Sequence, residues 1–201
     1  MLRPQYQGSN PVSDVWVTRA IEMVAQNIVR AVHNSDDEDA RGQMLLAATF
    51  AGVGFGNAGC HLPHGMSYPV SGRVRDYVPE GYKPDHPLIP HGMAVILNAP
   101  AVFRFTALAN PERHLHAAKL MGTDISFAGP EDASKLISDA IIKLIRELGM
   151  PNGLSAVGYT IEDVEDLVSG TLPQHRVTKL SPRPVDAENL AQLFSDSMVL
   201  W

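Results

Sequence analysis

The sequence has very little cysteine and no long uninterrupted apolar run. Cys60 is the only cysteine among 201 residues, which excludes a disulfide scaffold and a cysteine-based zinc ribbon and fits a reducing compartment. A membrane span needs about 18 consecutive apolar residues, and no such run is present. The first residues, MLRPQYQGSNP, lack the apolar core of a secretory signal.

Positive charge is also scarce. Sixteen Lys and Arg residues face 22 Asp and Glu residues, giving a formal net charge of −6. A nucleic-acid-binding protein shows a basic patch or stripe, so this balance argues against nucleic acid as a partner. The length suits a single domain over residues 1–201, which can bury about two-thirds of its unfolded surface without cross-links.

The sequence contains a series of helix signals. The alternation of apolar and polar residues that is typical of strands is almost absent. These signals predict an all-α fold. Asn10 before Pro11 is typical of a helix start. The side chains that then recur at three- and four-residue steps predict one apolar face; they are Val17, Ile21, Val24, Ile28 and Val32. The capping box over residues 35–38 predicts a second helix that begins near Asp36.

Residues 44–69 are nearly free of charge and rich in glycine and alanine. This composition predicts a central helix buried on all sides, broken around residues 54–59 and restarted at Pro63. The GxGxxG pattern of residues 54–59 follows a helical pattern and no strand, so it fails the test for a dinucleotide site. Close helix packing explains these glycines better.

The rest of the sequence predicts further helices separated by short polar loops. Residues 71–90 are charged and rich in proline, which indicates a surface loop. Residues 175–179 are predicted to form a solvated turn. Helices are expected from His91 with a bend at Pro100, from Asn110–Pro111 to Gly122, from Gly129 to Gly149, from Thr160 to Gly170, and from Asp186.

Histidines are the strongest candidates for chemistry, because four of the eight lie between residues 61 and 91. His61 and His64 are three apart and share a helix face, which Tyr68 joins four residues later. His91 begins the next apolar segment. Two neutral imidazoles from different helices can hold a divalent metal, although catalytic sites commonly use three protein ligands.

The alternative interpretation is that these histidines are ordinary structural residues, since HxxH alone is a weak pattern. The four histidines outside residues 61–91 occur in polar contexts and are interpreted as structural; they are His33, His114, His116 and His175. Cys60 is interpreted as inert packing.

The segment GFGNAGCHLPHGMSYPVSG, followed by DHPLIPHG, resembles a signature of the iron-containing (group III) alcohol dehydrogenases. The Ser-Tyr-Pro after HGM is similar to the hydroxyacid–oxoacid transhydrogenase branch of that family. QYQGSNPVSD, NPERHL and GTLPQHRVTKLSPRPVDAENLAQLF resemble the same branch, so the resemblance covers essentially the whole chain.

The resemblance implies a helical-bundle C-terminal domain, similar to that of dehydroquinate synthase. In the family, an N-terminal α/β domain that binds NAD(P) precedes it, and this sequence lacks that domain. Family members bind iron, or zinc, through an Asp-x-x-x-His helix and two later histidines, which correspond to His64 and His91. Tyr68 takes the place of a further active-site histidine and is the catalytic candidate. His61 is expected near the site without being a ligand.

The activity implied by the resemblance is hydride transfer from a small hydroxy acid such as 4-hydroxybutyrate to a 2-oxo acid such as 2-oxoglutarate. No Asp-x-x-x-His segment precedes the signature, so we expect the chain to be a fragment that alone binds metal weakly and is inactive. The implied location is mitochondrial for a eukaryotic protein and cytoplasmic otherwise, and a homo-oligomer is expected.

Two alternatives remain open at this stage. One is a non-catalytic, truncated helical module that associates with itself. The other is a metal-dependent hydrolase that uses HxxH with a distant histidine, and it is weakened because residues 52–70 contain no carboxylate to act as general base.

Overall fold

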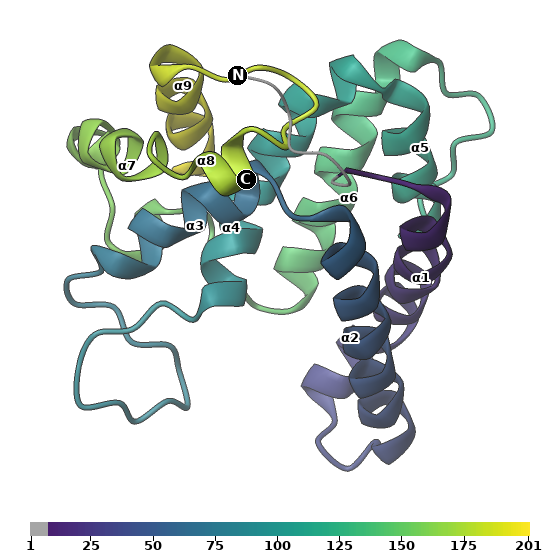
Figure 1. The fold of residues 1–201 in the computed structure, drawn as a ribbon. Coiled ribbons are helices and arrows are strands. Elements are labelled where there is room, and N and C mark those ends of the chain that lie inside the picture. Colours follow the sequence, from purple (N-terminus) through teal and green to yellow (C-terminus); the bar gives the residue numbers. More distant parts are fainter. Residues whose placement is uncertain (1–7) are drawn as a thin grey trace.

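The computed structural model describes residues 8–201, and within that range every regular element is helical (Figure 1). The all-α prediction is confirmed. The α-helices are α1 (Pro11–His33), α2 (Glu38–Ala58), α3 (Leu62–Gly72), α4 (His91–Thr106), α5 (Pro111–Leu120), α6 (Ala133–Glu147), α7 (Val164–Thr171), α8 (His175–Thr178) and α9 (Ala187–Ser197). Short 3-10 turns occupy Ala107–Ala109, Pro130–Asp132, Ser155–Val157 and Ile161–Asp163.

Most predicted helix starts are confirmed, because they depend on local hydrogen bonds. The side chains of Asn10, Asn110 and Asp186 each accept a backbone N–H from the first turn of the helix that follows. The second helix begins at Glu38, close to the predicted Asp36, but its cap differs from the predicted one. Asp37, and not Ser35, caps α2 by accepting the N–H of Ala40 at 2.9 Å.

Helices α1 and α2 form a hairpin with a seam of small residues. Apart from Met23, the buried positions recur every seven residues, and they are Ser13, Ala20 and Asn27 in α1 and Ala40, Ala47 and Gly54 in α2. The predicted apolar face of α1 lies beside this seam: four of its five residues are half-buried, and Val32 near the end of the helix is 55% exposed. Small side chains at the seam let the two backbones approach, so larger neighbours lie beside it.

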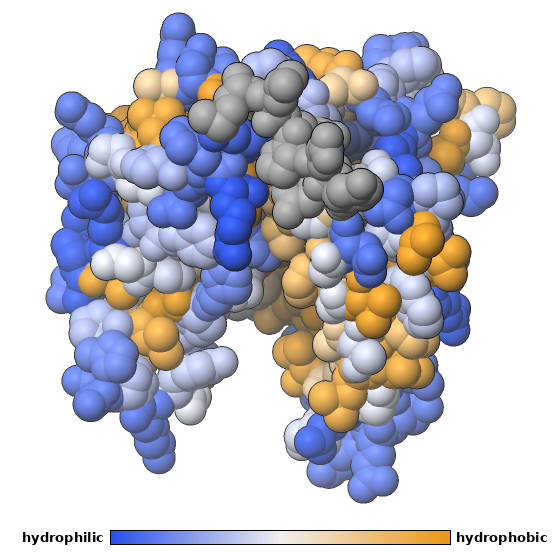
Figure 2. All heavy atoms as spheres, viewed as in Figure 1, coloured by the Kyte–Doolittle hydropathy of each residue, from blue (hydrophilic) through white to orange (hydrophobic). Residues whose placement is uncertain are grey.

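The prediction that residues 44–69 are buried on all sides is wrong for α2 and holds for α3 except along one face. Leu45 is 75% exposed and Phe55 is 51% exposed, because α2 packs mainly on α1. By contrast, Leu62 and Met66 of α3 are fully buried. Figure 2 shows apolar side chains on the surface of the hairpin and a hollow between it and the rest of the molecule.

The predicted break between these two helices is confirmed. Helix α2 ends at Ala58, and Gly59 follows with a φ of 79°, a left-handed value that glycine adopts at low cost. Pro63 then lies in the first turn of α3, where its missing N–H costs nothing. The axes of α2 and α3 differ by 110°.

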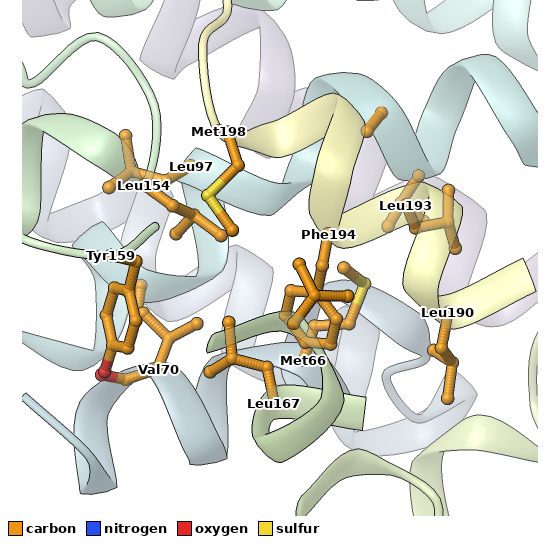
Figure 3. Packing of buried hydrophobic residues seen from close by; sticks show 14 of the residues in the cluster. Met66, Val70, Leu97, Leu154, Tyr159, Leu167, Leu190, Leu193, Phe194 and Met198 are labelled. Atoms are coloured by element: carbon orange, nitrogen blue, oxygen red, sulfur yellow. The ribbon is translucent and has the colours of Figure 1, made fainter. Parts of the chain in front are cut away.

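Helix α3 packs against α4, α7 and the segment around α9 to form the main core (Figure 3). Met66, Leu167 and Phe194 meet there and are fully buried. The far side of α4 packs on α6, whose Ile137, Ile141 and Ile145 are buried there. Helix α4 is thus held on two sides.

The segment His91–Ala109, which is α4 with the turn after it, is long and apolar enough to cross a membrane by length and composition alone. Half of this segment is buried inside the protein. Its apolar side chains already pack against α3, α6 and α9, so burial in the core accounts for the composition.

Replacing Gly54 by alanine is expected to destabilise the hairpin. The added Cβ would lie 2.2 Å from Val17 Cγ1 and 3.3 Å from the Val17 backbone nitrogen. Valine has one strongly preferred rotamer in a helix, so it cannot move away freely. We expect a net loss of up to about 2 kcal/mol in the free energy of unfolding, measured by circular dichroism in urea.

Gly52→Ala is the matched control, because nothing lies within 4 Å of its added Cβ. Alanine is the better helix former by about 1 kcal/mol, so this variant should be unchanged or more stable. Equal stability of the two variants would contradict the small-residue seam.

Candidate metal centre

Helix α3 has one face that the core does not cover. His61, His64 and Tyr68 are each half-buried, whereas the residues between them are buried. Their spacing of three and four residues places them in one row on the helix. The face expected from the sequence is therefore the one that the fold leaves open.

Helix α4 begins beside this face, with His91 as its first residue. Ser71 at the end of α3 donates a hydrogen bond to the carbonyl oxygen of Ile89, at 3.2 Å. Because Ile89 is itself buried, this contact fixes the start of α4 relative to α3.

The imidazole rings of His64 and His91 lie close together. Their centroids are 5.4 Å apart and their planes make an angle of 62°. Two imidazoles that bind one tetrahedral ion through nitrogens about 2.0–2.1 Å from it have centroids about 5 Å apart. The separation of the pair therefore fits two ligands of one divalent ion.

Ser67 lies between the two histidines and is fully buried. Its hydroxyl donates to the backbone oxygen of His64 at 2.8 Å, and Nδ1 of His91 lies 3.4 Å from the same hydroxyl oxygen. Since the hydroxyl hydrogen is used for the carbonyl, the oxygen accepts from an Nδ1–H of His91. That tautomer leaves Nε2 of His91 with a free lone pair, the form that binds a metal.

His64 is kept neutral by its surroundings. Burial lowers the pKa of its imidazole, and the neighbouring His91 lowers that pKa further. A lowered pKa means that the ring is unprotonated at neutral pH. His64 therefore also has a lone pair available for a cation.

Tyr68 and Arg176 lie next to the histidine pair. The Tyr68 ring stacks on His91 with an interplanar angle of 11° and a centroid distance of 6.0 Å. Arg176 in α8 donates from Nη2 to the Tyr68 hydroxyl at 3.4 Å. The solvated turn predicted for residues 175–179 is thus wrong: it is a short helix with a buried residue, Val177.

Arg176 is a site residue that sequence reasoning missed. It is 108 positions from Tyr68 in the chain, and its local context carries only the signal of a polar turn. The packing of α8 against α3 brings Arg176 to this face.

The remaining candidates make other contacts. The His61 ring packs edge-to-face against Phe103, with centroids 5.8 Å apart. Burial raises the pKa of the Cys60 thiol, and the nearby Arg176 only partly opposes that rise. His114 is held between Thr106 and the backbone of Asn110.

Within residues 8–201, no group of three or more His, Cys, Asp or Glu side chains is placed to hold a metal ion. The sequence around the pair has no acid: there is none between Asp39 and Asp76, or between Asp85 and Glu112. The described helices thus present two neutral nitrogen donors and no carboxylate beside them.

The described residues form an all-helical domain in which two neighbouring helices bring a pair of histidines together. The comparison with known families shows which family of proteins carries this domain. The C-terminal part of the Fe-containing alcohol dehydrogenase family matches residues 6–198. The chain belongs to this family.

Curated relatives are similar over nearly the entire chain. The mitochondrial hydroxyacid-oxoacid transhydrogenase of Xenopus laevis is 56% identical over 99% of this chain, and that of Homo sapiens is 53% identical over 99%. In both cases the match spans 43% of the relative's own length. The chain thus spans less than half the length of these proteins.

Solved structures show the same fold. A 1,3-propanediol oxidoreductase superposes with a TM-score of 0.83 at 28% identity, covering 94% of this chain and 46% of the other. The alcohol dehydrogenase from Oenococcus oeni gives a TM-score of 0.82 at 25% identity, covering 94% and 45%.

Ser67→Ala is expected to release the tautomer of His91. Without the hydroxyl, Nδ1 loses its acceptor, so the ring should become a mixture of the two neutral tautomers. Long-range proton–nitrogen NMR spectra of the histidine rings distinguish them directly. The control is Ser169→Ala, which removes an exposed hydroxyl that bonds the backbone oxygen of Asp166 in α7. A His91 spectrum unchanged in Ser67→Ala would contradict the assigned hydrogen bond.

Proposed function

We propose that this chain supplies His64 and His91 as two ligands of the divalent metal centre of a hydroxyacid–oxoacid transhydrogenase. The observation that carries the proposal is the 5.4 Å separation of the two rings, in a chain of the Fe-containing alcohol dehydrogenase family. The relatives named as mitochondrial transhydrogenases support this activity and a mitochondrial location.

The residues of the chain have distinct roles in this proposal. His64 and His91 hold the cation through ring nitrogens, with Ser67 orienting His91. Tyr68 offers a hydroxyl beside the pair, as the catalytic candidate that bonds the substrate or a water. When bound, iron or zinc would supply Lewis acidity to the substrate hydroxyl, and NAD(P) would carry the hydride.

The proposal assigns the remaining metal ligands and the nucleotide-binding surface to polypeptide outside these 201 residues. Catalytic metal sites commonly use three protein ligands, whereas the described helices bring two histidines together. The curated relatives are more than twice as long as the matched region, which leaves room for both in proteins of their kind.

One observation favours the second candidate, a non-catalytic helical module that associates with itself. Helix α2 exposes Leu45, Leu46, Val53 and Phe55, and contiguous exposed apolar surface marks contact sites. Sedimentation of the 201-residue chain separates the two candidates: self-association without metal binding would favour the module.

Metal binding by the 201-residue chain tests the histidine pair. Titration calorimetry with Zn²⁺ should show weak binding, because two ligands are present. His64→Ala and His91→Ala should each weaken it by about tenfold or more, since losing a ligand costs at least as much as losing its supporting hydrogen bond.

His86→Ala is the matched control for that titration. His86 is five residues before His91 and its Nδ1 bonds the exposed carboxylate of Asp85 at 2.6 Å. Equal losses in all three variants would show that metal binds adventitiously, and would reject the pair as the metal site.

The 201-residue chain alone is expected to transfer no hydride. With 4-hydroxybutyrate, 2-oxoglutarate, NAD⁺ and metal supplied, formation of 2-hydroxyglutarate should stay at background by mass spectrometry. Turnover at an ordinary enzymatic rate, on the order of 1–1,000 per second, would overturn the assignment of the other metal ligands to polypeptide outside these 201 residues.

A further inference from the structure

Arg176 is a cation without an acidic partner at the edge of the histidine pair. Several other arginines bind carboxylates, as Arg75 does with Asp163 and Arg113 with Asp14. No carboxylate in residues 8–201 lies within 4.0 Å of the Arg176 guanidinium, and its hydrogen bond goes to the neutral hydroxyl of Tyr68. Its donors are thus largely available to a ligand.

The backbone of α8 holds Arg176 in this place. The next residue, Val177, is buried, and its Cγ2 lies 3.1 Å from the position of a Cβ built on Gly65. Thr178 Cγ2 lies 3.4 Å from the same point. Because Gly65 directly follows His64, this contact ties α8 to the turn that carries a proposed metal ligand.

The two helices that carry the histidine pair bring no negative charge to the side of Arg176. Helices α3 and α4 carry no Asp or Glu, and the guanidinium is close enough to Cys60 to lower the pKa of that thiol against the effect of burial. A divalent cation on the histidine pair would add positive charge. An anionic group is therefore the ligand that this surface attracts.

We propose that Arg176 binds the carboxylate of a hydroxy acid or oxo acid whose hydroxyl or carbonyl lies at the His64–His91 pair. A guanidinium offers parallel N–H donors that match the two oxygens of a carboxylate. Tyr68, which contacts both Arg176 and His91, lies along the path between the two ends of the substrate. This inference rests on the proposed function and makes Arg176 the residue that selects acids over neutral alcohols.

The first experiment measures binding without turnover. In the 201-residue chain labelled with ¹⁵N, the side-chain Nε–Hε signal of Arg176 should shift and saturate with 4-hydroxybutyrate. The neutral analogue 4-hydroxybutyramide should give no such shift. A shift of equal size with both probes, or none with either, would overturn the assignment.

The second experiment measures selectivity between an acid and a neutral alcohol. It uses the metal-loaded holoenzyme, in which this chain is joined to the remaining metal ligands and the nucleotide-binding surface. Arg176→Gln removes the charge and should lower the ratio of kcat/KM for 4-hydroxybutyrate to that for 1-butanol by about tenfold to a hundredfold, as expected for a lost charge-assisted hydrogen bond. Arg176→Lys should recover part of the ratio, because it restores charge without the paired donors. The loss in Arg176→Gln should appear mainly as a higher KM for the acid.

Arg19→Gln is the charge-matched control, since Arg19 lies on α1 and pairs with Glu22; its ratio should match that of the unsubstituted enzyme. Equal losses on acid and alcohol in Arg176→Gln would show a structural role and reject carboxylate selection. The two proposals fail separately. A carboxylate-dependent shift of Arg176 with no hydride transfer by the unsubstituted holoenzyme would reject the transhydrogenase and retain the anion site.

Discussion

Helix α3 is buried on most of its circumference, and this burial fixes which side chains it can present. Leu62, Met66 and Val70 face the core and are fully buried, so the helix cannot rotate without exposing them. Burying a side chain of this kind contributes about 1.5–3 kcal/mol. The position of His64 is therefore set by the apolar residues behind it, and the distance to His91 follows from how α4 packs against the same core.

The same packing determines the chemistry of the open face. Burial lowers the pKa of His64, and a fully buried serine orients the neighbouring imidazole. Both effects favour neutral rings with available lone pairs. The absence of carboxylates from α3 and α4 has a second effect, because it leaves the cationic Arg176 available to an anion. The nitrogen donors at one end and the guanidinium at the other are the features on which the proposed hydroxy-acid site depends.

Local signals could be predicted from the sequence, and long-range contacts could not. The caps at Asn10 and Asp186 are set by residues within one turn, and so are visible in the sequence. His64, Tyr68 and His91 could be named from spacing and family resemblance, but their mutual distances depend on how two helices pack. The apolar face predicted for α1 lies beside the seam of the α1–α2 hairpin, because large apolar residues suggest the buried face, whereas close approach of two backbones selects mostly small ones. Arg176 was missed because its position depends on contacts made far away in the chain.

The hairpin has a consequence for how the molecule opens. Helix α1 is tied to the rest of the protein by the ion pair between Asp14 and Arg113 and by His33, whose Nε2 lies 2.8 Å from the carbonyl oxygen of Glu147. Helix α2 depends mainly on α1, and Gly59 joins it to α3 through a sharp bend. An element with few buried contacts opens at a lower free energy than the core does. The backbone amides of α2 are therefore expected to exchange their hydrogens through a local opening, during which the two histidine-bearing helices stay folded.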